Sequence, residues 1–518
     1  MTSSSITTDV VVVGGGHNGL VAAAYLAKAG LKVRLFEGSD ELGGATASKR
    51  IFDGIDAKLS RYSYLVSLLP DQIVTDLSLD FETITRTISS FTPWQESNGE
   101  DKGLLISNDW NHAKDAFDAL GLHSEGESWR SFYDSIASVA PTISETFLKP
   151  LPTRQELRDA IGEELFELLF VRPLGQSLER YFQDDRVRGI VLTDGLIGTF
   201  TDPQDPSLLA NRCFLYHLVG NGDGQWRVPR GGMGSLVTEL RRVAEGYGVI
   251  IETGKPVTAI ESGRVSLNDS TIETRFIVAA CSPRELARLR GLPESVALTP
   301  GSQLEVNMVL TRLPRLKSGV DPRDAFAGTF HIDESFDQLQ LAYREAMSGS
   351  LPETIPAEIY CHTLTDPSIL SDELIAAGYH TLTLFALHTP YSLFVSDEDP
   401  SRNDSMKQVA LKRLMKQLNA YLIDPIEQCL ARDAHGGLAI EVKSPVDLEH
   451  EIGLPLGNIF HADLTFPFRE EDERLQWGSE TDDPTIFLAG AGSRRGGGVS
   501  GIGGHNAAMA ILSSLSNP

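Results

Sequence analysis

A glycine-rich turn near the N-terminus constrains the fold of this chain more than any other feature. Residues 9–13 form an apolar, valine-rich run typical of a buried parallel strand, and residues 14–19 follow with a GxGxxG pattern. Residues 20–29 have helix-forming spacing, and residues 31–36 indicate a second strand that ends at Glu37. This order predicts a βαβ unit that binds a dinucleotide.

The residues of the glycine turn have separate expected roles. Gly14 permits the tight turn, and Gly16 allows backbone N–H groups to approach the pyrophosphate. Gly19 lets the helix pack closely on the strand. His17 and Asn18 lie between these glycines, so we expect both to contact the cofactor as well.

The residues after the second strand favour one dinucleotide. Glu37 can accept a hydrogen bond from a ribose hydroxyl, and an acid at this position argues against a 2′-phosphate. Gly43 and Gly44, with Ala45 and Thr46, resemble the extended motif that follows the βαβ unit in flavoprotein oxidoreductases. The resemblance implies FAD, bound in part by these four residues.

The C-terminal segment, residues 485–512, indicates a second contact with the cofactor. It has the order of an apolar strand, a glycine-dense loop and a small-residue helix. A helix N-terminus there would stabilise the negative charge of a reduced flavin. The alternative is a flexible glycine loop without a ligand. We expect the cofactor contacts of this segment to be Gly490, Gly492, Gly498, Val499 and His505, and the alternative for His505 is a role in helix capping or packing.

Six segments together resemble the phytoene desaturase-related flavoproteins, and most closely the branch with pyridine nucleotide-disulfide oxidoreductase domain-containing protein 2 and beta-carotene ketolase-like proteins. They are GGGHNGLVAAAYLAKAG (14–30), SRYSYLVSLLPDQI (60–73), LTDGLIGTFTDPQDPS (192–207), VPRGGMGSL (228–236), SPVDLEHEIGLPLGNIFHADL (444–464) and GGGVSGIGGHNAA (496–508). One departure is residues 489–492, where many relatives carry an acid that contacts the flavin ribityl chain and this chain has none.

The predicted fold class is α/β, with a Rossmann-like FAD-binding domain and a discontinuous mixed α+β substrate domain. The FAD-binding domain is expected at residues 1–80, 225–300 and 455–518, and the substrate-binding domain at residues 81–224 and 301–454. In flavoproteins of this kind the backbone near Val257 pairs with the adenine. Helices are expected within residues 105–220 and at 405–422, and strands at 304–310, 358–362 and 380–388.

Three residues are candidates for acid–base chemistry. His461 and Asp463 lie two residues apart, so on a strand they would share one face and form a His–Asp pair. His217 lies in an otherwise apolar segment. The alternatives are structural: a hydrogen bond at a domain joint for the pair, and a hydrogen-bonded core residue for His217.

Four further side chains carry two interpretations each. Arg494 and Arg495 precede the last glycine run, where they would balance reduced-flavin charge, bind an anionic substrate or lie solvated in a loop. Tyr62 and Tyr64 would share one face of an extended segment, either as an aromatic wall against the substrate or as core residues.

Composition and spacing exclude several other functions. The net charge of −26 argues against nucleic acid as a partner. The 4 cysteines are far apart, which excludes disulfide chemistry, and the 12 histidines show no metal-binding spacing, so no metal is expected. No run of about 18 apolar residues occurs, and residues 1–8 lack the features of a signal or transit peptide. We therefore expect a cytoplasmic protein; its oligomeric state is not defined by the sequence.

These observations predict an FAD-dependent oxidoreductase. The expected reaction is dehydrogenation, desaturation or a related oxidation of a hydrophobic or amphipathic small molecule that is carotenoid-like or lipid-like. One alternative is an oxidase of amines or amino-acid-derived substrates, which shares the fold. The other is an FAD-binding interaction or assembly protein without turnover. Because no basic amphipathic helix is evident, contact with a membrane would be peripheral.

Overall fold

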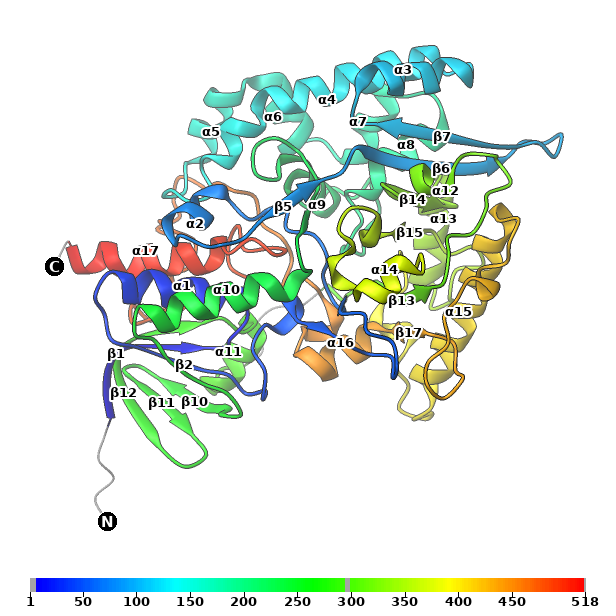
Figure 1. Cartoon of the computed structure of the whole chain (residues 1–518). Helices are drawn as coiled ribbons and strands as arrows, with labels where there is room; N and C mark the ends of the chain where they lie inside the picture. The colour runs from blue at the N-terminus through cyan, green and yellow to red at the C-terminus, as the bar shows by residue number, and fades with distance from the viewer. Residues whose placement is uncertain (1–5, 294–298, 517–518) are drawn as a thin grey trace.

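Two seven-stranded β-sheets organise the computed structural model, which describes residues 6–293 and 299–516 (Figure 1). The strands of the first sheet come from residues 6–36, 250–279 and 486–488. The strands of the second come from residues 88–107 and 304–443. The α/β class with a Rossmann-like unit is thereby confirmed. The domain limits at residues 80, 224, 300 and 454 remain a prediction, and parts of the predicted FAD-binding ranges, 1–5, 294–298 and 517–518, lie outside the described residues.

The first sheet has the strand order β10-β11-β12-β1-β2-β9, and β18 pairs with the end of β12. Its strands are β1 (Ile6–Val13), β2 (Val33–Phe36), β9 (Ile250–Glu252), β10 (Val257–Glu261), β11 (Arg264–Leu267), β12 (Thr271–Ala279) and β18 (Ile486–Leu488). The five strands other than β10 and β11 are joined by parallel pairings. Val10, Val11 and Val12 are fully buried, as expected for a central parallel strand that is covered on both faces.

Three helices cover one face of this sheet: α1 (His17–Lys28), α10 (Met233–Gly246) and α17 (Ile502–Ser516) (Figure 1). Small residues allow α1 and α17 to approach closely. A Cβ atom on Gly504 would lie 2.1 Å from the carbonyl oxygen of Asn18, so this contact requires glycine. On the opposite face, Leu286 and Leu289 of α11 (Pro283–Leu289) pack in one cluster with Val11.

The second sheet has the order β17-β13-β16-β15-β14-β6-β7. Its strands are β6 (Ile88–Gln95), β7 (Asp101–Ser107), β13 (Leu304–Leu310), β14 (Thr329–Ile332), β15 (Ala357–Tyr360), β16 (His380–Ala386) and β17 (Ile440–Lys443). Only β6 and β14 pair in parallel among these described neighbours. Val306 and Met308 of β13 pack in one cluster with Leu414 of α15 (Arg402–Tyr421), so residues at the alternate positions of β13 lie on the other face.

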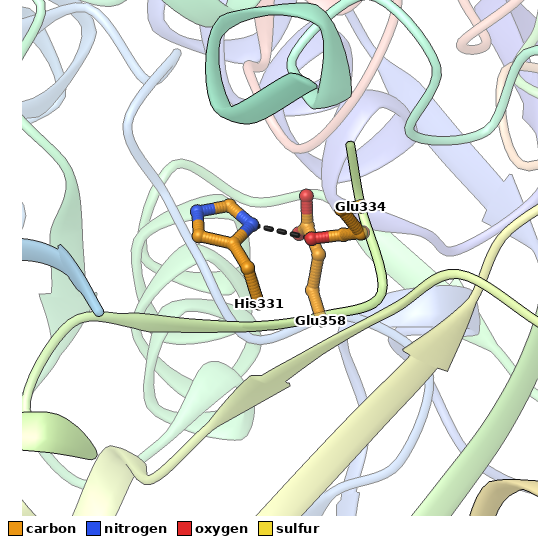
Figure 2. Close-up of side chains that lie close together, drawn as sticks. All are labelled: His331, Glu334 and Glu358. Atoms are coloured by element: carbon orange, nitrogen blue, oxygen red, sulfur yellow. Dashed lines mark hydrogen bonds and ion pairs between the residues drawn. The ribbon is translucent and has the colours of Figure 1, made fainter. Parts of the chain in front are cut away.

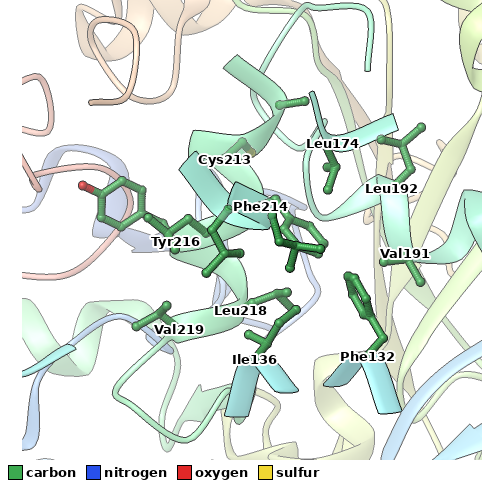
Figure 3. Close-up of a cluster of buried hydrophobic side chains, with 14 of the residues drawn as sticks. Phe132, Ile136, Leu174, Val191, Leu192, Cys213, Phe214, Tyr216, Leu218 and Val219 are labelled. Atoms are coloured by element: carbon green, nitrogen blue, oxygen red, sulfur yellow. The ribbon is translucent and has the colours of Figure 1, made fainter. Parts of the chain in front are cut away.

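A helical layer covers the upper part of the molecule in Figure 1. Its helices are α3 (Trp110–Ala119), α4 (His123–Ser144), α5 (Arg154–Ile161), α6 (Glu163–Phe170), α7 (Leu174–Tyr181), α8 (Asp185–Thr193) and α9 (Leu209–Val219). Their apolar side chains form one large core cluster, in which Phe132, Val191 and Phe214 meet from three helices (Figure 3).

Shorter elements complete the chain. They are β3 (Ser48–Lys49) paired with β4 (Leu59–Ser60), β5 (Thr83–Thr85) paired with β8 (Arg227–Pro229), α2 (Asp71–Asp76), α12 (Pro322–Ala325), α13 (Phe336–Met347), α14 (Asp372–Ala376), α16 (Pro445–Ile452) and the 3₁₀ helices η1 (Gly44–Thr46), η2 (His362–Leu364), η3 (Pro367–Ile369), η4 (Tyr391–Leu393), η5 (Ile426–Gln428) and η6 (Pro455–Gly457). No helix of the described residues is both long and apolar enough to cross a membrane.

Element limits differ from the sequence expectations by a few residues. The first helix begins at His17 rather than residue 20, because Gly16 acts as its N-cap with extended backbone angles (φ −69°, ψ 172°). The strand expected at 358–362 ends at Tyr360, where the chain turns into η2. The helix expected at 405–422 begins at Arg402.

Candidate functional site

A cavity of about 630 Å³ lies between the first sheet and the second. At one end it is bounded by Val13 and Phe36, the last residues of β1 and β2, and by Ala280 just after β12. The carboxyl ends of parallel strands are where α/β sheets bind ligands. At the other end Tyr360 and Phe385 of the second sheet face the same space.

The glycine turn lies at the cavity as the sequence predicts. Gly14 and Gly16 line it, whereas Gly19 does not. A Cβ atom on Gly19 would lie 2.1 Å from the carbonyl oxygen of Gly14, so Gly19 serves the contact between helix and strand. The carboxylate of Glu37, also in the lining, accepts hydrogen bonds from the N–H of Gly15 at 2.7 Å and of Ser39 at 2.8 Å, which fixes the turn.

The second glycine pair also lines the cavity, and Ala45 does so with Gly43 and Gly44. Thr46 does not reach the surface of the cavity. It is fully buried, and its hydroxyl donates to the carbonyl oxygen of Gly43 at 2.5 Å. The sequence predicts a direct contact between Thr46 and the cofactor. The structure instead places Thr46 behind the glycine pair, where its hydroxyl holds Gly43 in position. Val257, at the start of β10, also lies in the lining, and its pairing with the adenine stays a prediction.

The C-terminal loop contributes fewer residues than predicted. Gly498 and Val499 line the cavity, but Gly490, Gly492 and His505 do not. A Cβ atom on Gly490 would lie 2.5 Å from the carbonyl oxygen of Cys281, and one on Gly492 would lie 2.6 Å from the ring of Pro283. These two glycines therefore allow close packing. His505 is buried elsewhere: its Nδ1–H donates to Asn506 Oδ1 at 2.9 Å and its ring contacts a tyrosine edge.

The predicted His461–Asp463 pair does not form. Residues 459–462 make a turn instead of a strand, and His461 adopts a left-handed φ of 63°, so the two side chains do not share a strand face. His461 lines the cavity, while Asp463 does not and interacts electrostatically with Arg212. Burial lowers the pKa of His461 to about 4, so its imidazole is neutral near pH 7.

His217 lines the cavity next to an aromatic wall. Its Nδ1–H donates to the carbonyl oxygen of Cys213 at 2.9 Å, and its ring stacks on Trp226 with centroids 6.3 Å apart. Burial lowers its pKa as well. The hydrogen bond within helix α9 and the contact with the backbone of Asp194 favour the structural alternative for His217.

Tyr62 and Tyr64 both line the cavity, in an irregular segment rather than a strand. The hydroxyl of Tyr62 donates to Glu451. The ring of Tyr64 lies 4.8 Å from that of Tyr360 and 4.9 Å from that of Phe385, between centroids. Tyr64 thus packs in a buried aromatic cluster that also borders the cavity, and its contact with a substrate stays a prediction.

Two polar side chains of the second sheet were not predicted. Gln303 and Glu305 both line the cavity and are 2% exposed each. Neither polar atom of the Gln303 amide has a hydrogen-bond partner among the described residues. Glu305 accepts a hydrogen bond from Asn307 at 3.2 Å, and burial raises its pKa well above the usual range. The available signal was the alternation of polar residues along an otherwise apolar strand.

Arg494 and Arg495 have structural roles. Arg494 pairs with Glu473 at 2.8 Å, and neither arginine lines the cavity. Arg495 is 1% exposed and donates to the carbonyl oxygens of Lys149 and Trp477, each at 2.8 Å. The backbone acceptors of Arg495 do not adjoin it in sequence, so the sequence pattern did not reveal these hydrogen bonds.

The four cysteines form no disulfide in the described residues. All four are free, and burial raises the pKa of Cys281, the member that lines the cavity, to about 12. A thiol in this state is a weak nucleophile.

The glycine end of the cavity fits FAD. Three buried polar atoms there have no hydrogen-bond partner among the described residues: His17 Nε2, Asn18 Oδ1 and His461 Nδ1. A Cβ atom on Gly16 would meet no surrounding protein atom closer than 4.0 Å, and one on Gly44 none closer than 3.9 Å. The protein therefore leaves open space beside two backbone segments and the N-terminus of α1, where N–H groups can hold a pyrophosphate.

Comparisons with known proteins agree with this geometry. Residues 12–72 match the model of the NAD(P)-binding Rossmann-like domain, and residues 126–309 match that of the flavin containing amine oxidoreductase family. The solved structure of putrescine oxidase bound to putrescine aligns with a TM-score of 0.56 over 99% of this chain and 100% of that one. Its sequence identity of 18% makes this a likeness of fold.

Three relatives define the family. An uncharacterized protein of Mycobacterium tuberculosis is 44% identical over 98% of both chains. Pyridine nucleotide-disulfide oxidoreductase domain-containing protein 2 of Mus musculus is 29% identical over 98% of this chain and 94% of its own. Carotenoid 3,4-desaturase of Haloarcula japonica is 25% identical over 49% of this chain and 50% of its own. This chain belongs to the phytoene desaturase-related family of FAD-dependent oxidoreductases, and FAD is its cofactor.

Proposed function

We propose that this oxidoreductase dehydrogenates, desaturates or otherwise oxidises a hydrophobic or amphipathic small molecule that is carotenoid-like or lipid-like. The observation that carries the proposal is the continuity of the cavity, which joins the glycine motifs to a wall built from Tyr64, Trp226, Tyr360 and Phe385. Such a wall binds an extended apolar molecule and excludes water from the reacting carbon.

FAD, when bound, supplies the acceptor for a hydride from the substrate. We propose that the backbone at Gly14, Gly16, Gly43 and Gly44 holds the cofactor. The neutral imidazole of His461 then faces the same space with an unpartnered Nδ1, so it is suited to bind a polar atom, and its pKa of about 4 makes it only a weak base.

The remaining cofactor contacts are proposed with the same reasoning. His17, Asn18, Glu37, Ala45, Val257, Gly498 and Val499 line the cavity and are assigned to FAD. Gly19, Thr46, Gly490 and Gly492 support these residues from behind. The substrate lies against the aromatic wall, with His217 at its edge.

The test is flavin reduction without oxygen. The purified holoprotein is mixed anaerobically with phytoene, a long-chain unsaturated fatty alcohol or benzylamine, and absorbance is followed near 450 nm. Bleaching by phytoene or the fatty alcohol supports the proposal. Bleaching by benzylamine alone replaces the substrate class, and a flavin that only dithionite bleaches supports the alternative of an FAD-binding protein without turnover.

A second candidate, an oxidase of amines or amino-acid-derived substrates, is favoured by Glu305 on β13 and by Gln303 just before this strand. Nearby, Arg61 and Lys443 pair with Glu441 and Glu451, so Glu305 is left without an ion-pair partner among the described residues. Burial keeps the free Glu305 carboxyl protonated, and an ammonium group bound beside it would favour its anionic form, with the aromatic rings completing the site. Replacement by Gln should then raise the amine concentration needed for half-maximal reduction at least about tenfold, and leave reduction by an apolar substrate unchanged.

A further inference from the structure

Three side chains that can bind metal ions meet in the second sheet, away from the cavity lining. His331 on β14 is the direct cross-strand neighbour of Glu358 on β15, and Glu334 follows in the turn after β14. One ligand atom from each residue lies within 4.8 Å of the other two. Figure 2 shows the three side chains directed toward one another. No short-range motif joins them, so sequence spacing alone did not reveal the cluster.

Burial makes the charge of this cluster costly. Its exposed fractions are 3% for His331, 3% for Glu334 and 1% for Glu358. Asp194, which is partly buried, lies close enough to interact electrostatically with both glutamates. None of the three acids forms an ion pair with lysine or arginine in residues 6–293 and 299–516. Arg86, a buried cation that interacts electrostatically with Glu358, lies over the rings of Trp226 and Tyr360 and outside the cluster.

One carboxylate oxygen points to a missing partner. Glu334 Oε2 is hydrogen-bonded to His331 Nδ1 at 2.5 Å, but Glu334 Oε1 has no hydrogen-bond partner in the described part of the chain, although its side chain is fully buried. An unsatisfied carboxylate oxygen in the interior is rare because it loses its hydration without replacement. Either protons or a cation must compensate these acids.

We propose that His331, Glu334 and Glu358 form a buried site for one divalent transition-metal ion. An imidazole nitrogen with two carboxylate oxygens suits Zn²⁺ and Mn²⁺, whereas Mg²⁺ and Ca²⁺ prefer oxygen ligands alone. Binding displaces the proton shared by His331 and Glu334, so the ion takes the place of their hydrogen bond. It also supplies the positive charge that the three acids lack.

The ion would stabilise the wall of the cavity. Glu358 accepts a hydrogen bond from the hydroxyl of Tyr360, and the ring of Tyr360 lines the cavity. A metal ion that holds Glu358 as an anion therefore fixes the position of this ring. The site is structural and does not depend on the proposed substrate.

The test measures bound metal in the purified holoprotein. The protein is produced with added ZnCl₂, treated with EDTA, passed over a desalting column and analysed by inductively coupled plasma mass spectrometry. The variants are His331→Gln and Glu334→Gln. The matched control is Glu125→Gln, a buried glutamate on α4 that accepts from the backbone N–H of Gln183 at 3.1 Å.

We expect about one Zn²⁺ per chain in the wild type and the control, and less than about a tenth in both variants. Wild-type protein without zinc, or variants that keep as much as the wild type, would overturn the proposal and leave protonation as the source of compensation. If the variants do not fold, wild-type protein loaded with Mn²⁺ decides by electron–nuclear double resonance. Coupling to a ¹⁴N nucleus supports the ligation by His331, and its absence contradicts it.

Discussion

The same small change at two glycines of one motif should impair two different properties, FAD affinity at Gly16 and stability at Gly19. In Gly16→Ala the new methyl meets no surrounding protein atom closer than 4.0 Å, and the backbone angles (φ −69°, ψ 172°) suit alanine. The methyl occupies space that we assign to the pyrophosphate. Loss of one charge-assisted hydrogen bond costs about 1.5–3 kcal/mol, so FAD should bind about 10- to 100-fold more weakly.

In Gly19→Ala the methyl would lie 2.1 Å from the carbonyl oxygen of Gly14 and 3.1 Å from the Cβ of Ala280. Helix α1 must move away from β1, which costs about 1–3 kcal/mol or more of stability even without cofactor. Titration of the FAD-free proteins with FAD, followed by flavin fluorescence, gives the affinities. Urea denaturation of the same FAD-free proteins gives the stabilities.

The assignment of the pyrophosphate to the space beside Gly16 is refuted if Gly16→Ala binds FAD as tightly as the wild type, because the cofactor then does not approach this backbone. It is also refuted if Gly16→Ala shifts the urea midpoint as much as Gly19→Ala does. The wild type supplies the reference for both measurements.

Three further substitutions test other parts of the structure. His461→Asn, which tolerates the left-handed φ of 63°, should slow anaerobic flavin reduction about tenfold or more and leave the bound flavin spectrum unchanged; an unchanged rate returns His461 to a structural role. Burial lowers the pKa of His388 to about 3, so its contribution to stability is complete above pH 6.5 and is lost as the pH falls toward 3. His388→Phe should remove up to about 5 kcal/mol of the stability that is lost on acidification, so the midpoint of acid unfolding should move to lower pH. An unshifted midpoint in an acid titration followed by circular dichroism would contradict this expectation. Arg495→Met removes a fully buried guanidinium and its hydrogen bonds to three backbone carbonyl oxygens, so it should lower the unfolding free energy by about 2–4 kcal/mol. A change under about 0.5 kcal/mol in urea denaturation would contradict this expectation.

The cofactor end of the site could be predicted because its residues are close in sequence. Gly14, Gly16 and Glu37 belong to one βαβ unit, in which spacing alone fixes which backbone atoms meet. Gly43 and Gly44 follow within a few residues. The sequence could not separate lining glycines from packing glycines such as Gly19, because both lie in the same motif and differ only in what surrounds them.

The opposite wall of the cavity could not be predicted from spacing. Gln303 lies just before β13 and Phe385 lies on β16. These two strands pair although a long segment of chain separates them, and the register of their pairing decides which side chains face the cavity. The sequence predicts a strand at His461. In the structure His461 itself has a left-handed φ, so the chain turns there and the side chains of His461 and Asp463 do not share a face. The buried Arg495 depends on backbone acceptors distant in sequence, which no local pattern encodes.

The most direct test of the account is a crystal structure of the holoprotein. The account predicts the pyrophosphate of FAD at the N-terminus of α1, beside Gly16, with the flavin ring between this turn and His461 and with the aromatic wall at Tyr64 and Phe385 free for substrate. A flavin that lies against Tyr64 and Phe385, with its pyrophosphate away from Gly16, would contradict the assignment of the two ends of the cavity.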